Sequence, residues 1–160
     1  MSPFRWGSRV YWEDTDGGGI VYYANYLRFL ERARTEWLRS LGYSQRALAE
    51  EPGIVFAVVS LNIEYRKPAK LDDELFITCE PKVEGAATIV FAQQIYRSAG
   101  GAQAGGRQAR GREAIDQGQA SLLVEASARV ACLDARTLRP RRLPDFLATA
   151  DSGANIKEPS

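Results

Sequence analysis

The feature that most constrains the fold is a single long amphipathic helix pattern, which is followed by strand patterns. From about Tyr23 to Leu41, apolar residues recur every three or four positions and charged residues fill most of the gaps. Gly42 ends this pattern, and a short second helix is predicted over Tyr43 to Glu51, before Pro52 and Gly53. One long helix with several strands predicts an α+β domain, in which a mostly antiparallel sheet holds the helix against one face.

Strand patterns are predicted both before and after the long helix. The expected strands cover residues 4–13, 54–65, 74–83, 88–96 and 120–133. A glycine-rich segment, residues 98–119, lacks apolar periodicity and is predicted to be a flexible hairpin insertion. We expect one domain over residues 1–147 and a disordered tail over residues 148–160.

Composition excludes several classes of function. The net charge is +1, from 21 basic and 20 acidic side chains, so no overall field favours nucleic acid. The chain has no apolar signal core at Met1 to Trp6 and no run of about 20 apolar residues, so the cytoplasm is expected and a transmembrane segment is not. The count of zero histidines excludes Ser-His-Asp triads, Cys-His pairs and most catalytic zinc sites. Catalysis would therefore depend on carboxylates, hydroxyls and backbone amides.

The candidate site lies just before the long helix, where the chain reads Glu13-Asp14-Thr15-Asp16-Gly17-Gly18-Gly19-Ile20-Val21-Tyr22-Tyr23. A carboxylate on a glycine turn beside the unpaired amides of a helix start can act as a nucleophile or base next to an oxyanion site. From these residues alone, a turn residue or a helix cap is the favoured interpretation of Asp16, and Asp14 is expected to hydrogen-bond the turn.

The same run, continued by Ala24-Asn25-Tyr26 and by Phe29-Leu30-Glu31-Arg32-Ala33-Arg34-Thr35-Glu36-Trp37-Leu38, resembles hotdog-fold acyl-CoA thioesterases. The YbgC type, associated with the Tol-Pal system, is most similar, and 4-hydroxybenzoyl-CoA thioesterases are more distant. The segment Ile63-Glu64-Tyr65-Arg66-Lys67-Pro68-Ala69-Lys70-Leu71-Asp72-Asp73 matches the same family.

The resemblance implies a five-stranded antiparallel sheet wrapped around the long helix, in a homodimer or homotetramer with active sites at the subunit interface. It implies hydrolysis of an acyl-CoA thioester without a cofactor. By this resemblance Asp16 is the catalytic carboxylate, as nucleophile or as general base, while amides near Tyr23 polarise the carbonyl and Gly18, Gly19 and Val21 contact the substrate. The YbgC type usually carries histidine where this chain has Tyr23.

Three further residues are secondary candidates. Glu31 could face the cleft and orient a water or Asp16, and a solvated or ion-paired helix glutamate is an equally good interpretation. Arg66 and Lys67 could meet the phosphates of coenzyme A, although plain surface charge is the simpler interpretation. No metal site is expected, because no further ligand follows Asp72 and Asp73 at useful spacing.

Thioester hydrolysis has two alternatives, a dehydratase and a binding protein. An acyl-carrier dehydratase of the same fold uses a histidine in its familiar form, and this chain has none. The second alternative, a non-catalytic protein that binds acyl-CoA or an acyl carrier protein, stays open. Acyl chain length cannot be read from the sequence.

Overall fold

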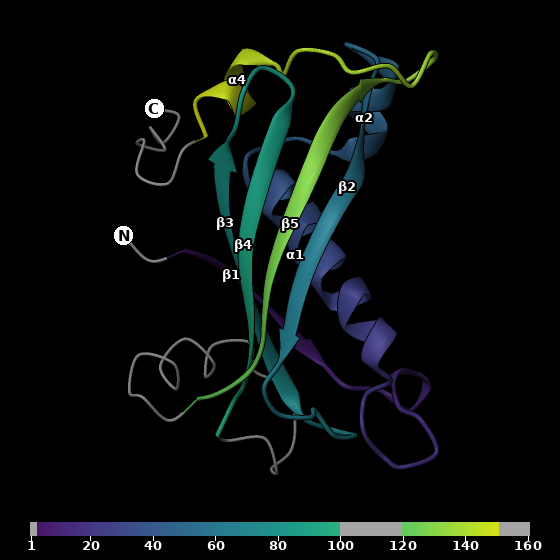
Figure 1. Ribbon diagram of the computed structural model, residues 1–160, viewed down its shortest axis with the longest axis vertical. Coiled ribbons are helices and arrows are strands. Elements are labelled where there is room, and N and C mark those ends of the chain that lie inside the picture. The colour runs from purple at the N-terminus through teal and green to yellow at the C-terminus, as the bar shows by residue number, and fades with distance from the viewer. Residues whose placement is uncertain (1–2, 100–119, 151–160) are drawn as a thin grey trace.

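The computed structural model describes residues 3–99 and 120–150. Its five-stranded sheet is antiparallel throughout, in the order β1-β3-β4-β5-β2. The strands are β1 (Phe4–Arg9), β2 (Ile54–Tyr65), β3 (Glu74–Val83), β4 (Thr88–Arg97) and β5 (Ser121–Asp134). The long helix α1 (Tyr26–Ser40) lies along one face of this sheet (Figure 1). The predicted α+β architecture is confirmed.

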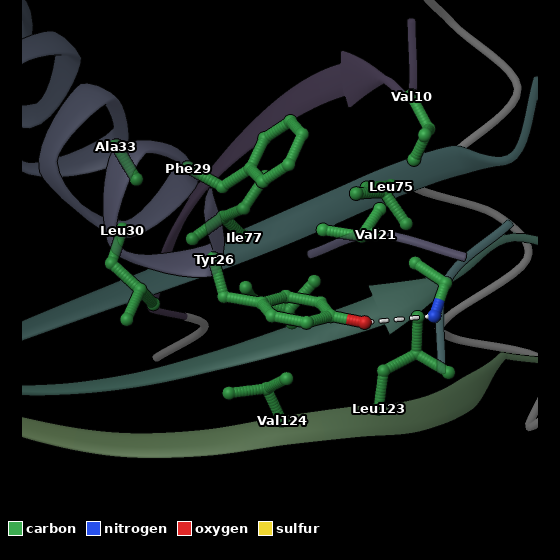
Figure 2. Close-up of a cluster of buried hydrophobic side chains, with 12 residues drawn as sticks. Val10, Val21, Tyr26, Phe29, Leu30, Ala33, Leu75, Ile77, Leu123 and Val124 are labelled. Carbon is green, nitrogen blue, oxygen red and sulfur yellow. Dashed lines mark hydrogen bonds between the residues drawn. The ribbon is translucent and has the colours of Figure 1, made fainter. Parts of the chain in front are cut away.

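The core forms where the apolar stripe of α1 meets the sheet. Phe29, Leu30 and Ala33 are fully buried and cluster with sheet residues that include Ile77 and Val124 (Figure 2). Burying each large apolar side chain contributes roughly 1.5–3 kcal/mol. The 3.6-residue spacing of the stripe therefore fixes which face of the helix meets the sheet, and it leaves the opposite face to the charged residues.

The first strand ends earlier than its sequence pattern predicts. β1 stops at Arg9, and residues Trp12–Asp14 form a short 3₁₀ helix, so the predicted strand over residues 4–13 is wrong at its end. The apolar run there reads as a strand, but the Tyr11 backbone N–H donates to Asp14 Oδ2 at 2.8 Å. This local hydrogen bond offers the backbone an alternative to the sheet ladder.

The start of the long helix also differs from the prediction. Residues Tyr23–Asn25 form a 3₁₀ helix, and regular α geometry begins only at Tyr26. Helix ends are often 3₁₀, because an i+3 hydrogen bond satisfies end groups that have no α-helical partner. The tighter turn places the amides of Tyr23 and its neighbour at the very tip of the helix.

The remaining elements follow the sequence with one addition. Helix α2 (Gln45–Glu50) is capped by Ser44, whose Oγ accepts from the Ala47 N–H at 3.2 Å. Helix α4 (Asp145–Ala148) was not predicted, and it buries Leu147. Residues 148–150 are described, whereas the rest of the predicted tail and residues 100–119 of the predicted insertion lie outside the described residues.

Candidate functional site

The site turn, residues 15–21, is closed by an antiparallel bridge between Thr15 and Val21. Inside this bridge, the Asp16 N–H donates to the Ile20 carbonyl at 2.9 Å and the Gly19 N–H donates to the Asp16 carbonyl at 3.2 Å. Gly19 adopts φ = 77°, a left-handed conformation that glycine reaches without the penalty other residues incur. The turn is therefore a defined loop with Asp16 near its tip.

The Asp16 carboxylate is exposed, and one of its oxygens is held in place. Its Oδ1 accepts a hydrogen bond from the Gly18 N–H at 2.7 Å. A Cβ added to Gly18 would lie 3.2 Å from the same oxygen, so glycine lets the backbone approach the acid closely. Within residues 3–99 and 120–150, no group donates a hydrogen bond to Oδ2. This oxygen is free to react with a substrate or a water.

Asp14, in contrast, is only 5% exposed and serves the turn itself. Its side chain accepts from the Tyr11 N–H, and its carbonyl accepts from the Tyr22 N–H at 3.1 Å and from Asn25 Nδ2 at 3.0 Å. These bonds join the turn to the helix start. The prediction that Asp14 hydrogen-bonds the turn is confirmed, and Asn25 is a supporting residue that the sequence did not reveal.

The helix tip carries two available amides. Among the described residues, none accepts a hydrogen bond from the backbone N–H of Tyr23 or Ala24. The carbonyls of the same two peptide groups are both engaged, because Tyr22 O accepts from the Asn25 N–H at 2.8 Å and Tyr23 O accepts from the Tyr65 hydroxyl at 2.9 Å. Fixed, unpaired amides at a helix start are suited to hold an oxyanion.

The loop that follows β2 anchors the turn from the other side. Buried Val21 donates its N–H to the Ala69 carbonyl at 2.9 Å, and Ile20 forms a bridge with Lys70. The Tyr26 hydroxyl accepts from the Ala69 N–H at 2.9 Å (Figure 2), and burial raises the pKa of this hydroxyl. The site turn, the helix start and this loop therefore form one connected unit.

The secondary candidates have different surroundings. Arg66 already pairs with Glu64 at 2.6 Å and with Glu125 at 2.7 Å, and its guanidinium holds the pKa of Glu125 below the usual range. Lys67 is exposed, and its ammonium has no partner among the residues that the structure describes. Glu31 Oε1 accepts from Thr35 Oγ1 at 2.8 Å, one turn further along the same helix. No contact joins it to Asp16 within the described ranges.

The acidic pair before β3 has a structural role. Asp73 Oδ2 accepts from the Lys70 N–H at 2.8 Å and lies 3.4 Å from Arg97 Nη1, while Asp72 adopts φ = 69°. Asp73 therefore holds the turn that precedes β3. Over residues 3–99 and 120–150, no three histidine, cysteine or acidic side chains gather to form a candidate metal site.

A small cavity of about 50 Å³ lies beside the second half of α1, away from the helix start that carries the site. Its lining includes Arg34, Trp37 and, from β2, Phe56. In the part of the chain that the structure describes, no helix is both long enough and apolar enough to cross a membrane.

Comparison with known proteins shows which family the chain is similar to. Residues 18–104 match the Thioesterase superfamily, and the matched range begins two residues after Asp16. The YbgC acyl-CoA thioesterase of Haemophilus influenzae is 39% identical over 147 residues, which cover 92% of this chain and 93% of that protein. A probable thioesterase from Bartonella henselae has a TM-score of 0.71 at 30% identity, over 89% of this chain and all of that one.

A more distant structure matches equally well in shape. It is an Asp-to-Asn mutant of 4-hydroxybenzoyl-CoA thioesterase in complex with 4-hydroxybenzoyl-CoA, with a TM-score of 0.74 at 24% identity over 93% of this chain and 98% of that one. At this identity the likeness concerns the fold, which is the hotdog fold: a five-stranded antiparallel sheet with one long helix against it. With more than half of its residues matched and a relative aligned over nearly its whole length, the chain belongs to the thioesterase superfamily.

Proposed function

We propose that this protein hydrolyses acyl-CoA thioesters to a free acid and coenzyme A, with Asp16 as the reacting carboxylate. The observation that carries the proposal is an exposed carboxylate on a turn that is hydrogen-bonded to the helix tip. Among the described residues, Gly18 holds one oxygen of this carboxylate, the other oxygen has no donor, and the two tip amides are unpaired. The names of the relatives support the choice of substrate class, since the YbgC protein of Haemophilus influenzae is called an acyl-CoA thioesterase.

Thioester hydrolysis needs a hydrogen-bond donor to the thioester carbonyl oxygen. It also needs a carboxylate that attacks the carbonyl carbon or activates a water to do so. In the proposed complex the N–H groups of Tyr23 and Ala24 donate to the thioester carbonyl, where the positive end of the helix dipole adds to the stabilisation. Asp16 then acts in one of two ways. It attacks the carbonyl carbon, which releases the coenzyme A thiolate and leaves a mixed anhydride for water to hydrolyse, or it takes a proton from a water that attacks directly.

Asp16→Asn tests this role while it keeps the shape of the turn. We expect kcat for thiol release to fall by about 10²- to 10⁴-fold across a panel of short, long and aromatic acyl-CoAs, because an amide is neither a nucleophile nor a base. Glu13→Gln is the matched control, since it neutralises an exposed acid three residues away. An Asp16→Asn protein as fast as the wild type would contradict the mechanism.

Thiol release by the wild type distinguishes hydrolysis from the alternative, a non-catalytic binding protein. That alternative would be favoured if the wild type released no thiol and a separate binding measurement showed tight binding of acyl-CoA or of an acyl carrier thioester. An association with the Tol-Pal system stays a prediction.

For the phosphates of coenzyme A we propose Lys67 in preference to Arg66. Arg66 already has two carboxylate partners, whereas the Lys67 ammonium has none among the described residues. Lys67→Gln is therefore expected to raise KM several-fold and to leave kcat unchanged, while Arg66→Gln changes KM less. The opposite order would contradict this assignment.

We also propose that two copies of the chain associate through β2, in a homodimer or in a homotetramer that contains it. Within residues 3–99 and 120–150, β2 lies at the edge of the sheet with β5 as its one strand neighbour, and it exposes Val58, Val59 and Leu61 by 38–57%. A long apolar edge strand without a partner is a template for pairing with another chain. Sedimentation velocity of Leu61→Asp should give a lighter species than the wild type, while Leu138→Asp, at an exposed loop leucine, should not. A monomeric wild type would contradict the proposal.

A further inference from the structure

We infer that Tyr65 is a positioning residue for this hydrolysis, because its hydroxyl holds and polarises the peptide group that presents the Ala24 N–H. The inference rests on the proposed function, in which that N–H donates to the thioester carbonyl. Tyr65 lies 42 positions away from Tyr23 in the sequence, and the structure brings the two together.

The Tyr65 hydroxyl acts on a single peptide group, which joins Tyr23 to Ala24. The carbonyl of Tyr23 and the N–H of Ala24 belong to the same planar unit, so they cannot rotate independently. The Tyr65 hydroxyl donates to the Tyr23 carbonyl at 2.9 Å. This bond fixes the direction of the plane and therefore the direction of the Ala24 N–H at its other end. A hydrogen bond to the carbonyl also strengthens the N–H as a donor, because linked hydrogen bonds polarise one another.

The neighbouring peptide group, between Tyr22 and Tyr23, is held among the described residues by the backbone and not by a side chain. The Tyr23 N–H shares its plane with the Tyr22 carbonyl, which accepts from the backbone N–H of Asn25 at 2.8 Å. One of the two available amides is thus supported by the backbone of the helix tip, and the other by a side chain from the sheet. The contribution of the side chain can be removed without any change to the backbone.

Packing keeps the Tyr65 hydroxyl aimed at this carbonyl. Tyr65 is the last residue of β2 and is paired with Val124 of β5, so its backbone belongs to the sheet. Its ring lies edge-on to Tyr26 at 5.4 Å between centroids and to Tyr23 at 6.4 Å. Burial raises the pKa of the Tyr65 hydroxyl, so the group keeps the proton that it donates.

Tyr65→Phe removes the hydroxyl and keeps the ring contacts. We expect kcat to fall about 3- to 10-fold, the range for loss of one neutral hydrogen bond, with KM within about twofold of the wild type. Tyr43→Phe is the control, since it removes a tyrosine hydroxyl from a ring stacked on Phe146 and should leave both constants unchanged. An unchanged kcat in a folded Tyr65→Phe protein would overturn the inference.

A spectroscopic measurement separates this role from a structural one. The carbonyl stretch of 4-hydroxybenzoyl-CoA is measured free, bound to Asp16→Asn and bound to Asp16→Asn/Tyr65→Phe. We expect a shift to lower frequency on binding to the single variant and a smaller shift in the double variant. Equal shifts in the two variants would overturn the role of Tyr65 and leave the proposed function standing. No shift in the single variant would overturn the proposed carbonyl contact, and the inference with it.

Discussion

Gly19→Ala probes the left-handed corner of the site turn, and Gly17→Ala is its matched control. A Cβ added at either glycine meets no heavy atom within 4 Å, so neither substitution causes a clash. Gly19 has φ = 77°, whereas Gly17 is outside the left-handed region. Alanine in a left-handed conformation costs about 1–2 kcal/mol. Both substitutions reduce the entropy of the unfolded chain equally, so this gain cancels when the two variants are compared.

We therefore expect Gly19→Ala to be less stable than Gly17→Ala by about 1–2 kcal/mol, which corresponds to roughly 2–8 °C in Tm for a chain of this size. Thermal unfolding followed by circular dichroism measures the difference. The Val21 N–H donates to the Ala69 carbonyl and so joins the turn to the rest of the domain. The strain at Gly19→Ala is therefore expected to lower the midpoint of global unfolding. Equal midpoints for the two variants would refute the reasoning.

Two other substitutions test the interior. Tyr26→Phe leaves the Ala69 N–H without its acceptor and should cost about 1–3 kcal/mol in urea unfolding, whereas an unchanged midpoint would show that this bond contributes nothing. Burial raises the pKa of the Cys79 thiol to about 12 from an ordinary value of 9.0, so the folded chain binds the proton more tightly and its stability falls as the pH rises above about 9. From pH 8 to pH 10 the wild type should lose about 1.4 kcal/mol more than Cys79→Ala, and parallel losses would contradict the burial of a neutral thiol.

The sequence predicted those parts of the fold that depend on local periodicity. The apolar stripe of α1, the Val-, Ile- and Phe-rich composition of β2 and the alternation of β3 gave the correct element types, and the bounds of both strands. Stripe and alternation are informative because burial of one face imposes a fixed spacing on apolar residues. The prediction failed at the end of β1, where the apolar run Val10 to Trp12 is typical of a strand. There the bond from the Tyr11 N–H to Asp14 Oδ2 and the backbone bonds from the Asp14 and Thr15 N–H groups hold the chain in a 3₁₀ helix.

The contacts between distant segments required the tertiary structure. Glu125, one of the two partners of Arg66, lies 59 positions away from it, and this contact depends on the register of β2 on β5. Tyr65, the partner of the Tyr23 carbonyl, lies 42 positions away, and this contact depends on where β2 ends relative to the helix start. No spacing rule in the sequence encodes such distances, because they follow from strand register and from packing of the helix on the sheet.

The sequence by itself determined the kind of site: a histidine-free chain with a carboxylate on a glycine turn just before a helix. The tertiary structure decided which atoms of that site are free. It binds one oxygen of Asp16 to Gly18, buries Asp14 in the turn and engages the carbonyls of the tip peptides, which leaves the Tyr23 and Ala24 amides available among the described residues. The physical reason is that a hydrogen bond forms only where two groups meet in space, and folding alone brings the site turn, the helix tip and the end of β2 together.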